Sequence, residues 1–247
     1  AFCAFFFLSN LVQNLYLGIA IAVLVAGGLA MLIELLGYRP LLQKKARRIY
    51  LLITGLGIST MCENLIIICF SSRFRVYPIN FSNESINILG ASVGQIDLII
   101  FVVSMIALIA VELFIRKSRA GLAIRGASFD LEATSLMGVN VQKLILIVFM
   151  IAGSLAGLAG ALLGAKYTAF PTLGTAMTNK AFISSVFGGL GSIPGAVLGA
   201  ILLGVGETMI ASYVSSSMRD IFAYLLLVIV LFVRPSGLMG KEAEDKA

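Results

Sequence analysis

The chain has 247 residues, of which 60% are hydrophobic and only 12% are charged, and its mean hydropathy is +1.04. A water-soluble domain carries about 25% charged residues, so this composition excludes an ordinary soluble protein. The formal net charge of +6 does not indicate a nucleic-acid partner, because the basic residues lie in loops beside apolar segments, where they orient membrane spans.

Apolar stretches along the chain are long enough for helices that cross a bilayer, which takes about 20 residues. The alternating pattern of about ten residues that marks a membrane β-barrel is absent from the sequence. In chain order, the predicted membrane segments are residues 1–9, 11–36, 49–70, 95–115, 141–165, 181–213 and 221–233. The sequence therefore predicts an all-α fold, a polytopic transmembrane helix bundle with about six to seven membrane segments in a single membrane-embedded domain, residues 1–247. The apolar start "AFCAFFFL" is typical of the end of a span, and we expect at least one N-terminal span to be missing from this chain.

The region 181–213 is too short for two ordinary spans, since it offers roughly 33 residues where two helices need about 40. The motif "GGLGSIPG" interrupts it. One interpretation is a re-entrant or broken helix near 181–195, a device that transporters use to build a substrate path. The alternative is a short, tilted helix pair joined by a tight turn.

The distribution of basic residues predicts the orientation of the spans. Residues 37–48 and 116–143 each carry five Lys or Arg side chains, whereas residues 71–94 carry only Arg73 and Arg75. Cytoplasmic loops carry the excess of Lys and Arg, and two spans separate the two basic loops. We therefore expect both basic loops in the cytoplasm and residues 71–94 outside.

Glycines four residues apart occur in two of the predicted helices. Such residues share a helix face, and glycine lets two backbones approach closely in lipid. The glycines expected to pack helices together are Gly153, Gly157, Gly160, Gly164, Gly195 and Gly199.

Three polar residues lie inside predicted spans, where ionisable groups are costly and mark functional sites by default. Glu63 and its neighbour Asn64 lie near the middle of one span, and Glu207 lies late in the segment after the break. We consider them candidates for the translocation pathway. The alternative is that each carboxylate makes a hydrogen bond or an ion pair that holds two helices together.

The loop 116–142 contains "FDLEATSLMG", which has the pattern of a short amphipathic helix. Asp130 is in position to be its N-cap, Glu132 suits the positive end of the helix dipole, and Gly138 suits the left-handed residue that closes a helix. The apolar residues that fall on one face are Phe129, Ala133, Leu136 and Met137. A helix of about two turns is unstable alone, so it needs a surface to dock on, either the membrane interface or a groove of a soluble partner.

These residues resemble the EAA loop of ABC-importer permeases, with Thr134 in place of the second alanine. Together, "GLAIRGASFDLEATSLMGVNV", "KAFISSVFGGLGSIPGAVLGAILLGVGE" and "RPSGLMG" are similar to the branched-chain amino acid ABC permeases. The resemblance covers residues 119–240.

The resemblance implies a permease subunit of an ATP-driven importer in the bacterial plasma (inner) membrane. It implies a second permease subunit, two cytoplasmic ATPase subunits and a soluble extracytoplasmic substrate-binding protein as partners, and no cofactor. Glu132, Ala133 and Gly138 would belong to the helix that couples the permease to the ATPases. Thr134 would remain small enough to fit a groove.

Two further function classes are weighed against this interpretation. An ion-coupled secondary transporter would use Glu63 or Glu207 to carry protons, and it would have no need of the EAA-like helix. A membrane-embedded enzyme is disfavoured because the sequence has no histidine and no cluster with metal-ligand spacing. No phosphate-binding loop with its lysine occurs either, so ATP hydrolysis would belong to a separate chain.

Overall fold

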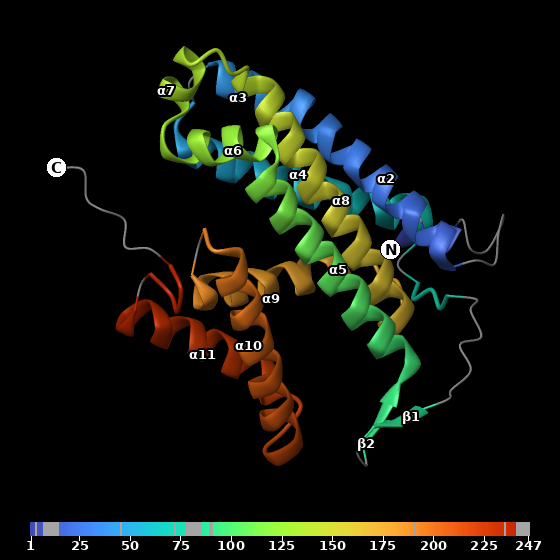
Figure 1. The fold of residues 1–247 in the computed structure, drawn as a ribbon. Coiled ribbons are helices and arrows are strands. Elements are labelled where there is room, and N and C mark those ends of the chain that lie inside the picture. The colour runs from blue at the N-terminus through green and yellow to red at the C-terminus, as the bar shows by residue number, and fades with distance from the viewer. Residues whose placement is uncertain are drawn as a thin grey trace. The chain divides into compact units, whose positions relative to one another are not determined.

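The structure is a computed structural model that describes residues 1–2, 4–6, 15–44, 46–71, 73–77, 85–88, 91–189, 191–234 and 236–240. Parts of the first two predicted spans, residues 3 and 7–14, lie outside these ranges. The elements are α2 (Leu15–Ile33), the π-helix η1 (Glu34–Tyr38), α3 (Arg39–Gln43), α4 (Arg48–Phe70), β1 (Ser85–Ile88), β2 (Ala91–Gly94), α5 (Gln95–Lys117), α6 (Arg119–Phe129), α7 (Leu131–Leu136), α8 (Val141–Tyr167), α9 (Leu173–Gly188), α10 (Ile193–Tyr213) and α11 (Met218–Val233) (Figure 1).

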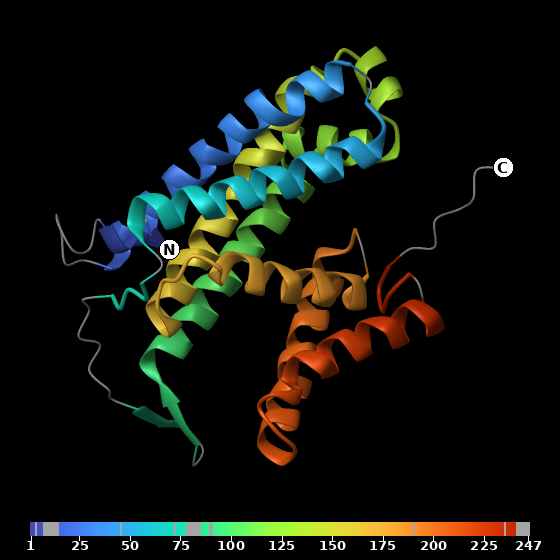
Figure 2. The same cartoon turned by 180° about the vertical axis from the view of Figure 1, so that it is seen from behind.

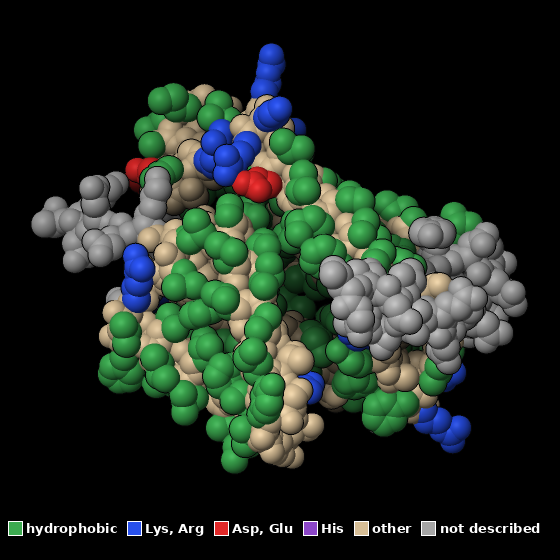
Figure 3. All heavy atoms as spheres, turned by 60° about the horizontal axis from the view of Figure 1, so that its bottom comes forward, with side chains coloured by type: hydrophobic (Ala, Val, Ile, Leu, Met, Phe, Trp, Pro, Cys, Tyr) green, Lys and Arg blue, Asp and Glu red, His purple; other side chains and the backbone are tan. Residues whose placement is uncertain are grey.

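The described residues form six helices that are long and apolar enough to cross a membrane. These are Leu17–Gln43, Ile49–Phe70, Gln95–Lys117, Val141–Tyr167, Ile193–Tyr213 and Ser216–Val233. Hydrophobic side chains cover most of the face drawn in Figure 3, far more than a soluble protein exposes. The predicted all-α bundle of membrane-spanning helices is thereby confirmed.

The chain divides into two compact units, Ala1–Pro171 and Thr172–Ala247. In the first unit α2 and α8 lie side by side and α5 runs along α8 (Figure 1). Seen from behind, α4 crosses this group obliquely (Figure 2). The short elements α3, α6 and α7 gather at one end of the unit, and the hairpin of β1 and β2 lies at the other.

Close backbone contact joins α2 to α8. A Cβ atom added to Gly157 would lie 2.7 Å from the carbonyl oxygen of Ala22, and one added to Gly153 would lie 2.8 Å from that of Ala26. The facing residues of α2 are also small and four apart, so both helices present the small surfaces that close packing in lipid needs. Farther along α8, Gly164 faces the ring of Tyr77.

The first long helix extends beyond its predicted end at residue 36 and reaches Gln43. The sequence analysis ended the span where the basic run 37–48 begins, and this run also contains Pro40, which has no N–H for an α-helical hydrogen bond. The helix continues past this proline through a π turn, in which the N–H of Arg39 donates to the carbonyl oxygen of Glu34, five residues back. The wider turn lets the helix pass through the proline.

The polar stretch 71–94 contains a hairpin that the sequence analysis did not predict. Strands β1 and β2 pair antiparallel, with Ser85 opposite Gly94 and Ile88 opposite Ala91. Four residues a strand are too few for the alternation of apolar and polar residues to stand out. The prediction that this stretch does not span the membrane is unaffected.

The second unit consists of α9, α10 and α11, which pack on one another around Ile183, Leu203 and Ala223. The sequence analysis began the first of these helices at residue 181, but α9 already begins at Leu173. Its first half, "LGTAMTNK", mixes strong helix formers with one glycine, two threonines and one asparagine, which are weaker, so propensity alone does not determine where the helix starts. The predicted break at "GGLGSIPG" is present, between α9 and α10.

At 16 residues, α9 is about 24 Å long, shorter than the hydrocarbon core of about 30 Å. The segment after α11 pairs with its end, since the N–H of Leu238 donates to the oxygen of Phe187 at 3.0 Å. The end of α9 therefore lies beside the segment that follows the last span. A re-entrant path for this helix stays a prediction.

Candidate functional site

The pair α6 and α7, residues 119–136, lies between the long helices α5 and α8. The sequence analysis predicted only the second helix. Helix α6 forms because the Oγ atom of Ser118 accepts a hydrogen bond from the N–H of Gly121 at 2.8 Å, the arrangement of an N-cap. The signal available in the sequence was Ser118 itself, but Gly121 and Gly126 lower the helix propensity of the segment after this cap.

Helix α7 is closed at both ends by the residues that the sequence pattern indicated. The Oδ1 atom of Asp130 accepts hydrogen bonds from the N–H groups of Glu132 at 2.8 Å and Ala133 at 3.1 Å. Gly138 has a φ of +84°, a left-handed conformation that stops a helix and that side chains with a Cβ adopt at a cost. The six residues of α7 are thus held as a helix from both sides.

Thr134 points inward rather than toward a partner. Its side chain is buried, its hydroxyl donates to the carbonyl oxygen of Asp130 at 2.7 Å, and a Cβ added to Gly126 would lie 3.5 Å from its Oγ1 atom. The expectation that Thr134 would fit a partner's groove is therefore wrong. The residue instead stabilises the contact between α7 and α6.

Three large apolar side chains at the two ends of α7 are almost fully exposed. Phe129 is 87% exposed, Leu136 is 90% exposed and Met137 is 87% exposed. Ala133 and Glu132 are exposed as well. The prediction that Phe129 shares a helix face with Ala133, Leu136 and Met137 is wrong, because Phe129 ends α6 and Asp130, between it and α7, has extended backbone. We call Phe129, Leu136 and Met137 the apolar ridge.

The α6–α7 element is connected directly to the membrane helices. Asn140 caps α8, since its Oδ1 atom accepts a hydrogen bond from the N–H of Lys143 at 3.1 Å. In the first turn of α8, Gln142 accepts a hydrogen bond from Arg39 at 2.9 Å. This bond joins the two basic loops at one end of the first unit, as their shared side of the membrane requires.

The polar residues predicted inside the spans have different environments. Glu63 is half-buried on α4, and the side-chain amide of Asn64 donates to the carbonyl oxygen of Thr60 on the same helix at 2.8 Å. The sequence analysis did not single out Glu34, which is only 1% exposed in the π turn. No partner for its Oε2 atom is found among the described residues.

Glu207 of the second unit is paired. Its Oε2 atom lies 2.8 Å from the Nζ atom of Lys180, which also lies 3.4 Å from Oδ1 of Asp220. The sequence analysis singled out neither Lys180 nor Asp220, which lie one residue before the predicted membrane segments 181–213 and 221–233. The three side chains come from α9, α10 and α11.

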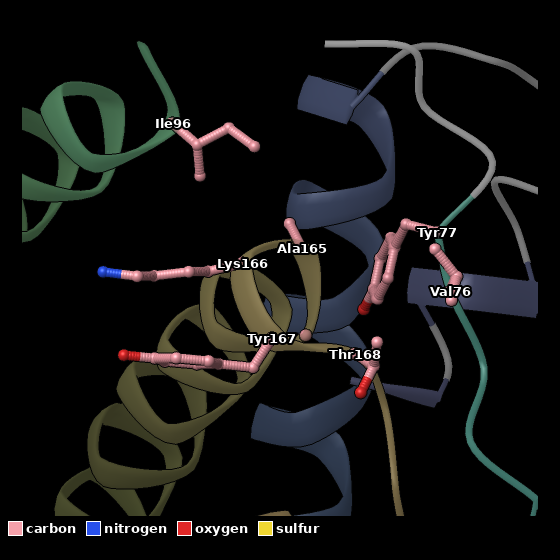
Figure 4. Close-up of a pocket in the computed structure, with 8 residues that line it drawn as sticks. Val76, Tyr77, Ile96, Ala165, Lys166, Tyr167 and Thr168 are labelled. Carbon is pink, nitrogen blue, oxygen red and sulfur yellow. The ribbon is translucent and has the colours of Figure 1, made fainter. Parts of the chain in front are cut away.

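A small crevice of about 120 Å³ lies in the first unit at the end opposite the α6–α7 element. Lys166 and Tyr167 extend away from Tyr77 and Thr168, toward the side of α5 (Figure 4). The Nζ atom of Lys166 lies 2.6 Å from Oδ1 of Asp97. This ion pair links α8 to the first turn of α5.

The six helices that are long and apolar enough to cross a membrane define a multi-pass membrane protein. The chain belongs to the family described as "Branched-chain amino acid transport system / permease component", which matches residues 1–231. Relatives that match most of the chain are permease subunits of branched-chain amino acid transporters, and no comparison supports an ion-coupled carrier.

Individual relatives are similar over most of the chain. The high-affinity branched-chain amino acid transport system permease protein LivH of Salmonella typhimurium is 34% identical over 230 residues, which covers 91% of this chain and 74% of LivH. BraD of Pseudomonas aeruginosa, a protein of the same description, is 34% identical over 92% of this chain and 75% of its own length. The probable LivH of Methanocaldococcus jannaschii is 27% identical over 87% of this chain and 72% of its own length. No solved structure matches the chain significantly.

Proposed function

We propose that this chain carries branched-chain or related small amino acids across the membrane as one permease subunit of an ATP-driven importer. The names of its relatives support the class of substrate. The observation that carries the ATP-driven mechanism is the apolar ridge, whose three exposed side chains lie at the two ends of the capped helix α7. A carrier that works alone would have no use for such a surface.

The ridge docks in a groove of a cytoplasmic ATPase subunit. Each of its three side chains is more than four-fifths exposed, and burying a large apolar side chain stabilises a contact by about 1.5–3 kcal/mol. Asp130 and Gly138 hold α7 in shape before docking, which lowers the entropy cost of binding. The coupling helix therefore comprises Phe129, Asp130, Glu132, Ala133, Leu136, Met137 and Gly138.

Movement of the docked helix passes into the membrane through α8. Asn140 and Gln142 tie the start of α8 to the loop and to Arg39. Farther along α8, the backbone contact of Gly157 with Ala22 makes α2 and α8 move together, because so close a contact leaves little room for sliding. In this mechanism ATP-driven closure of the ATPases shifts the pair α2–α8 and opens the path alternately to each side.

The remaining partners follow from the same mechanism. A second permease subunit completes the path, two ATPase subunits bind the two coupling helices, and a soluble binding protein delivers the amino acid from outside. The wide apolar faces of α4 and α5 are available for lipid or for the second permease. The bacterial plasma (inner) membrane is the location that fits these partners, and ATP hydrolysis belongs to the ATPase chains.

The test is purification of the full-length protein from native membranes in mild detergent, with identification of the chains that accompany it. We expect an ATPase and a second permease with the wild type, and loss of the ATPase with Leu136→Lys. Leu136→Met is the matched control, because it conserves volume and apolar character. Purification of the wild-type protein without an ATPase would contradict the proposal.

A further inference from the structure

A mixed-charge cluster in the second unit has a geometry that the proposed mechanism does not use. Lys180, Glu207 and Asp220 come from three different helices, and the ammonium of Lys180 lies between the two carboxylates. Only the contact with Glu207, at 2.8 Å, has the length of a charge-assisted hydrogen bond, about 2.7–2.9 Å. The contact with Asp220, at 3.4 Å, is loose.

Glu207 is the positioning residue of the cluster. Its side chain is only 13% exposed, and it holds Lys180 with one oxygen. Its other oxygen, Oε1, is buried without a hydrogen-bond partner among the described residues. A lysine ammonium has three N–H donors, so Lys180 keeps donors to spare while Glu207 fixes its position.

Lys180 and Asp220 both line a cavity of about 230 Å³ within the second unit. The side chain of Asp220 is 73% exposed, so most of its carboxylate is free to receive a ligand. Asn179 adds an amide to the polar side of this cavity, and Ala176 and Tyr224 supply exposed apolar surface. The volume is below that of drug-sized ligand sites, which begin at about 300 Å³, so the cavity suits only a small ligand.

The cavity thus offers a positive group, a negative group and an apolar surface within one small space. Glu207 compensates the charge of Lys180 within the buried pair, and Asp220, which is 73% exposed, keeps its charge in contact with water. A ligand that brings only a carboxylate would add to the negative charge, and a ligand that brings only an ammonium would leave Lys180 unused. A zwitterion with a short apolar group satisfies every part of the cavity.

We propose that this cavity is a binding site for the zwitterion of an α-amino acid. The ligand carboxylate binds the Nζ atom of Lys180, the ligand ammonium binds the carboxylate of Asp220, and the ligand side chain lies toward Ala176 and Tyr224. This inference deepens the proposed function and rests on it for the class of substrate.

The site lies near one end of its helices. Glu207 is six residues before the end of α10 at Tyr213, about 9 Å along the helix, and Asp220 is in the first turn of α11. In the orientation predicted from the basic loops, the connection between these helices faces outward. The cavity is therefore placed to receive an amino acid from the outer side.

The test measures binding of radiolabelled leucine to the purified complex with its ATPases, with two competitors of the same shape. One competitor, 4-methylpentanoate, lacks the ammonium, and the other, 3-methylbutylamine, lacks the carboxylate. We expect the wild type to bind leucine at least tenfold more tightly than either. Asp220→Asn should weaken leucine binding about tenfold, and leucine should then bind no more tightly than 4-methylpentanoate. In Lys180→Met, leucine should bind no more tightly than 3-methylbutylamine.

Two controls separate a binding role from a structural one. Arg219→Gln removes a neighbouring exposed charge and should leave leucine binding unchanged. The double variant Lys180→Glu with Glu207→Lys restores the ion pair between α9 and α10 but puts a carboxylate where the ligand's carboxylate must bind. We expect it to retain the ATPase subunits on purification and to lose leucine binding.

Each outcome bears on one of the two proposals. If Asp220→Asn and Lys180→Met keep the wild-type preference for leucine over both competitors, the site assignment is wrong and the permease function stands. If the double variant binds leucine like the wild type, the cluster only holds helices together, which also overturns the assignment. If the wild-type complex binds no amino acid, the substrate class of the proposed function fails, and this inference fails with it.

Discussion

Gly157 of α8 lies so close to Ala22 of α2 that a Cβ atom on the glycine would stand 2.7 Å from the alanine's carbonyl oxygen. Real side chains do not tolerate that separation from backbone, so a larger residue must push the helices apart. We predict that Gly157→Val lowers the stability of the folded protein by about 1–3 kcal/mol. Thermal unfolding of the purified protein measures this as a lower midpoint.

Gly28→Ala is the matched control for Gly157→Val, because a Cβ atom at Gly28 of α2 meets nothing within 4 Å. Alanine is the better helix former by about 1 kcal/mol, so this variant should unfold at the same temperature or slightly higher. Equal midpoints for Gly157→Val and the wild type would show that α2 and α8 do not pack as described.

The left-handed turn at Gly138 leads to a second prediction. Because Gly138 has a φ of +84° and nothing crowds a Cβ atom there, the cost of a side chain is purely conformational, about 1–2 kcal/mol. We predict that Gly138→Val reduces both transport and ATPase association while membrane insertion persists. Gly138→Asn, which accepts this conformation more readily, should retain most of both, and equal losses in the two variants would argue against a role for the turn.

The cap of α7 leads to a third prediction. Asp130 accepts two backbone hydrogen bonds, and replacing such a cap with alanine costs about 1 kcal/mol. We predict that Asp130→Ala frays α7 and weakens ATPase retention during purification. Asp130→Asn also caps and should behave like the wild type. If Asp130→Ala retained the ATPase fully, the helical form of α7 would not be what the partner binds.

The contact between the end of α9 and the segment after α11 leads to a fourth prediction. The N–H of Met239 donates to the oxygen of Gly188 at 2.9 Å, and a Cβ atom on Gly189, whose φ is +110°, would overlap the backbone of Gly240. We predict that Gly189→Ala frees residues 236–240 and that a cysteine introduced by Met239→Cys then reacts faster with a thiol reagent. Gly174→Ala, at an uncrowded helical position, is the control and should leave the reaction rate of the cysteine unchanged. A rate that stays slow in Gly189→Ala as well would refute the contact.

Sequence alone could predict the long spans, because a run of about 20 apolar residues has the length of a helix that crosses a bilayer. The ends of α7 could also be predicted, because Asp130 and Gly138 determine the conformation of the residues next to them in the sequence. Sequence alone could not predict α6 or the first half of α9, whose glycines and threonines are poor helix formers and whose helical form depends on packing.

The charge cluster could not be predicted from the sequence, for a different reason. Lys180 and Glu207 are 27 residues apart, and no local pattern indicates that α9 and α10 bring them together. Glu207 alone suggested a pathway residue, whereas the structure makes it the residue that holds Lys180. Thr134 was misjudged in the same way, because its burial against α6 depends on a helix that was not predicted.

The most direct test of the central claim is leucine uptake by vesicles that contain the complete transporter, with the binding protein outside and ATP either trapped inside or left out. The account predicts uptake only with ATP, no change when proton or sodium gradients are collapsed, and loss of uptake in Leu136→Lys but not in Leu136→Met. Uptake without ATP that followed an ion gradient, with Leu136→Lys as active as the wild type, would contradict it.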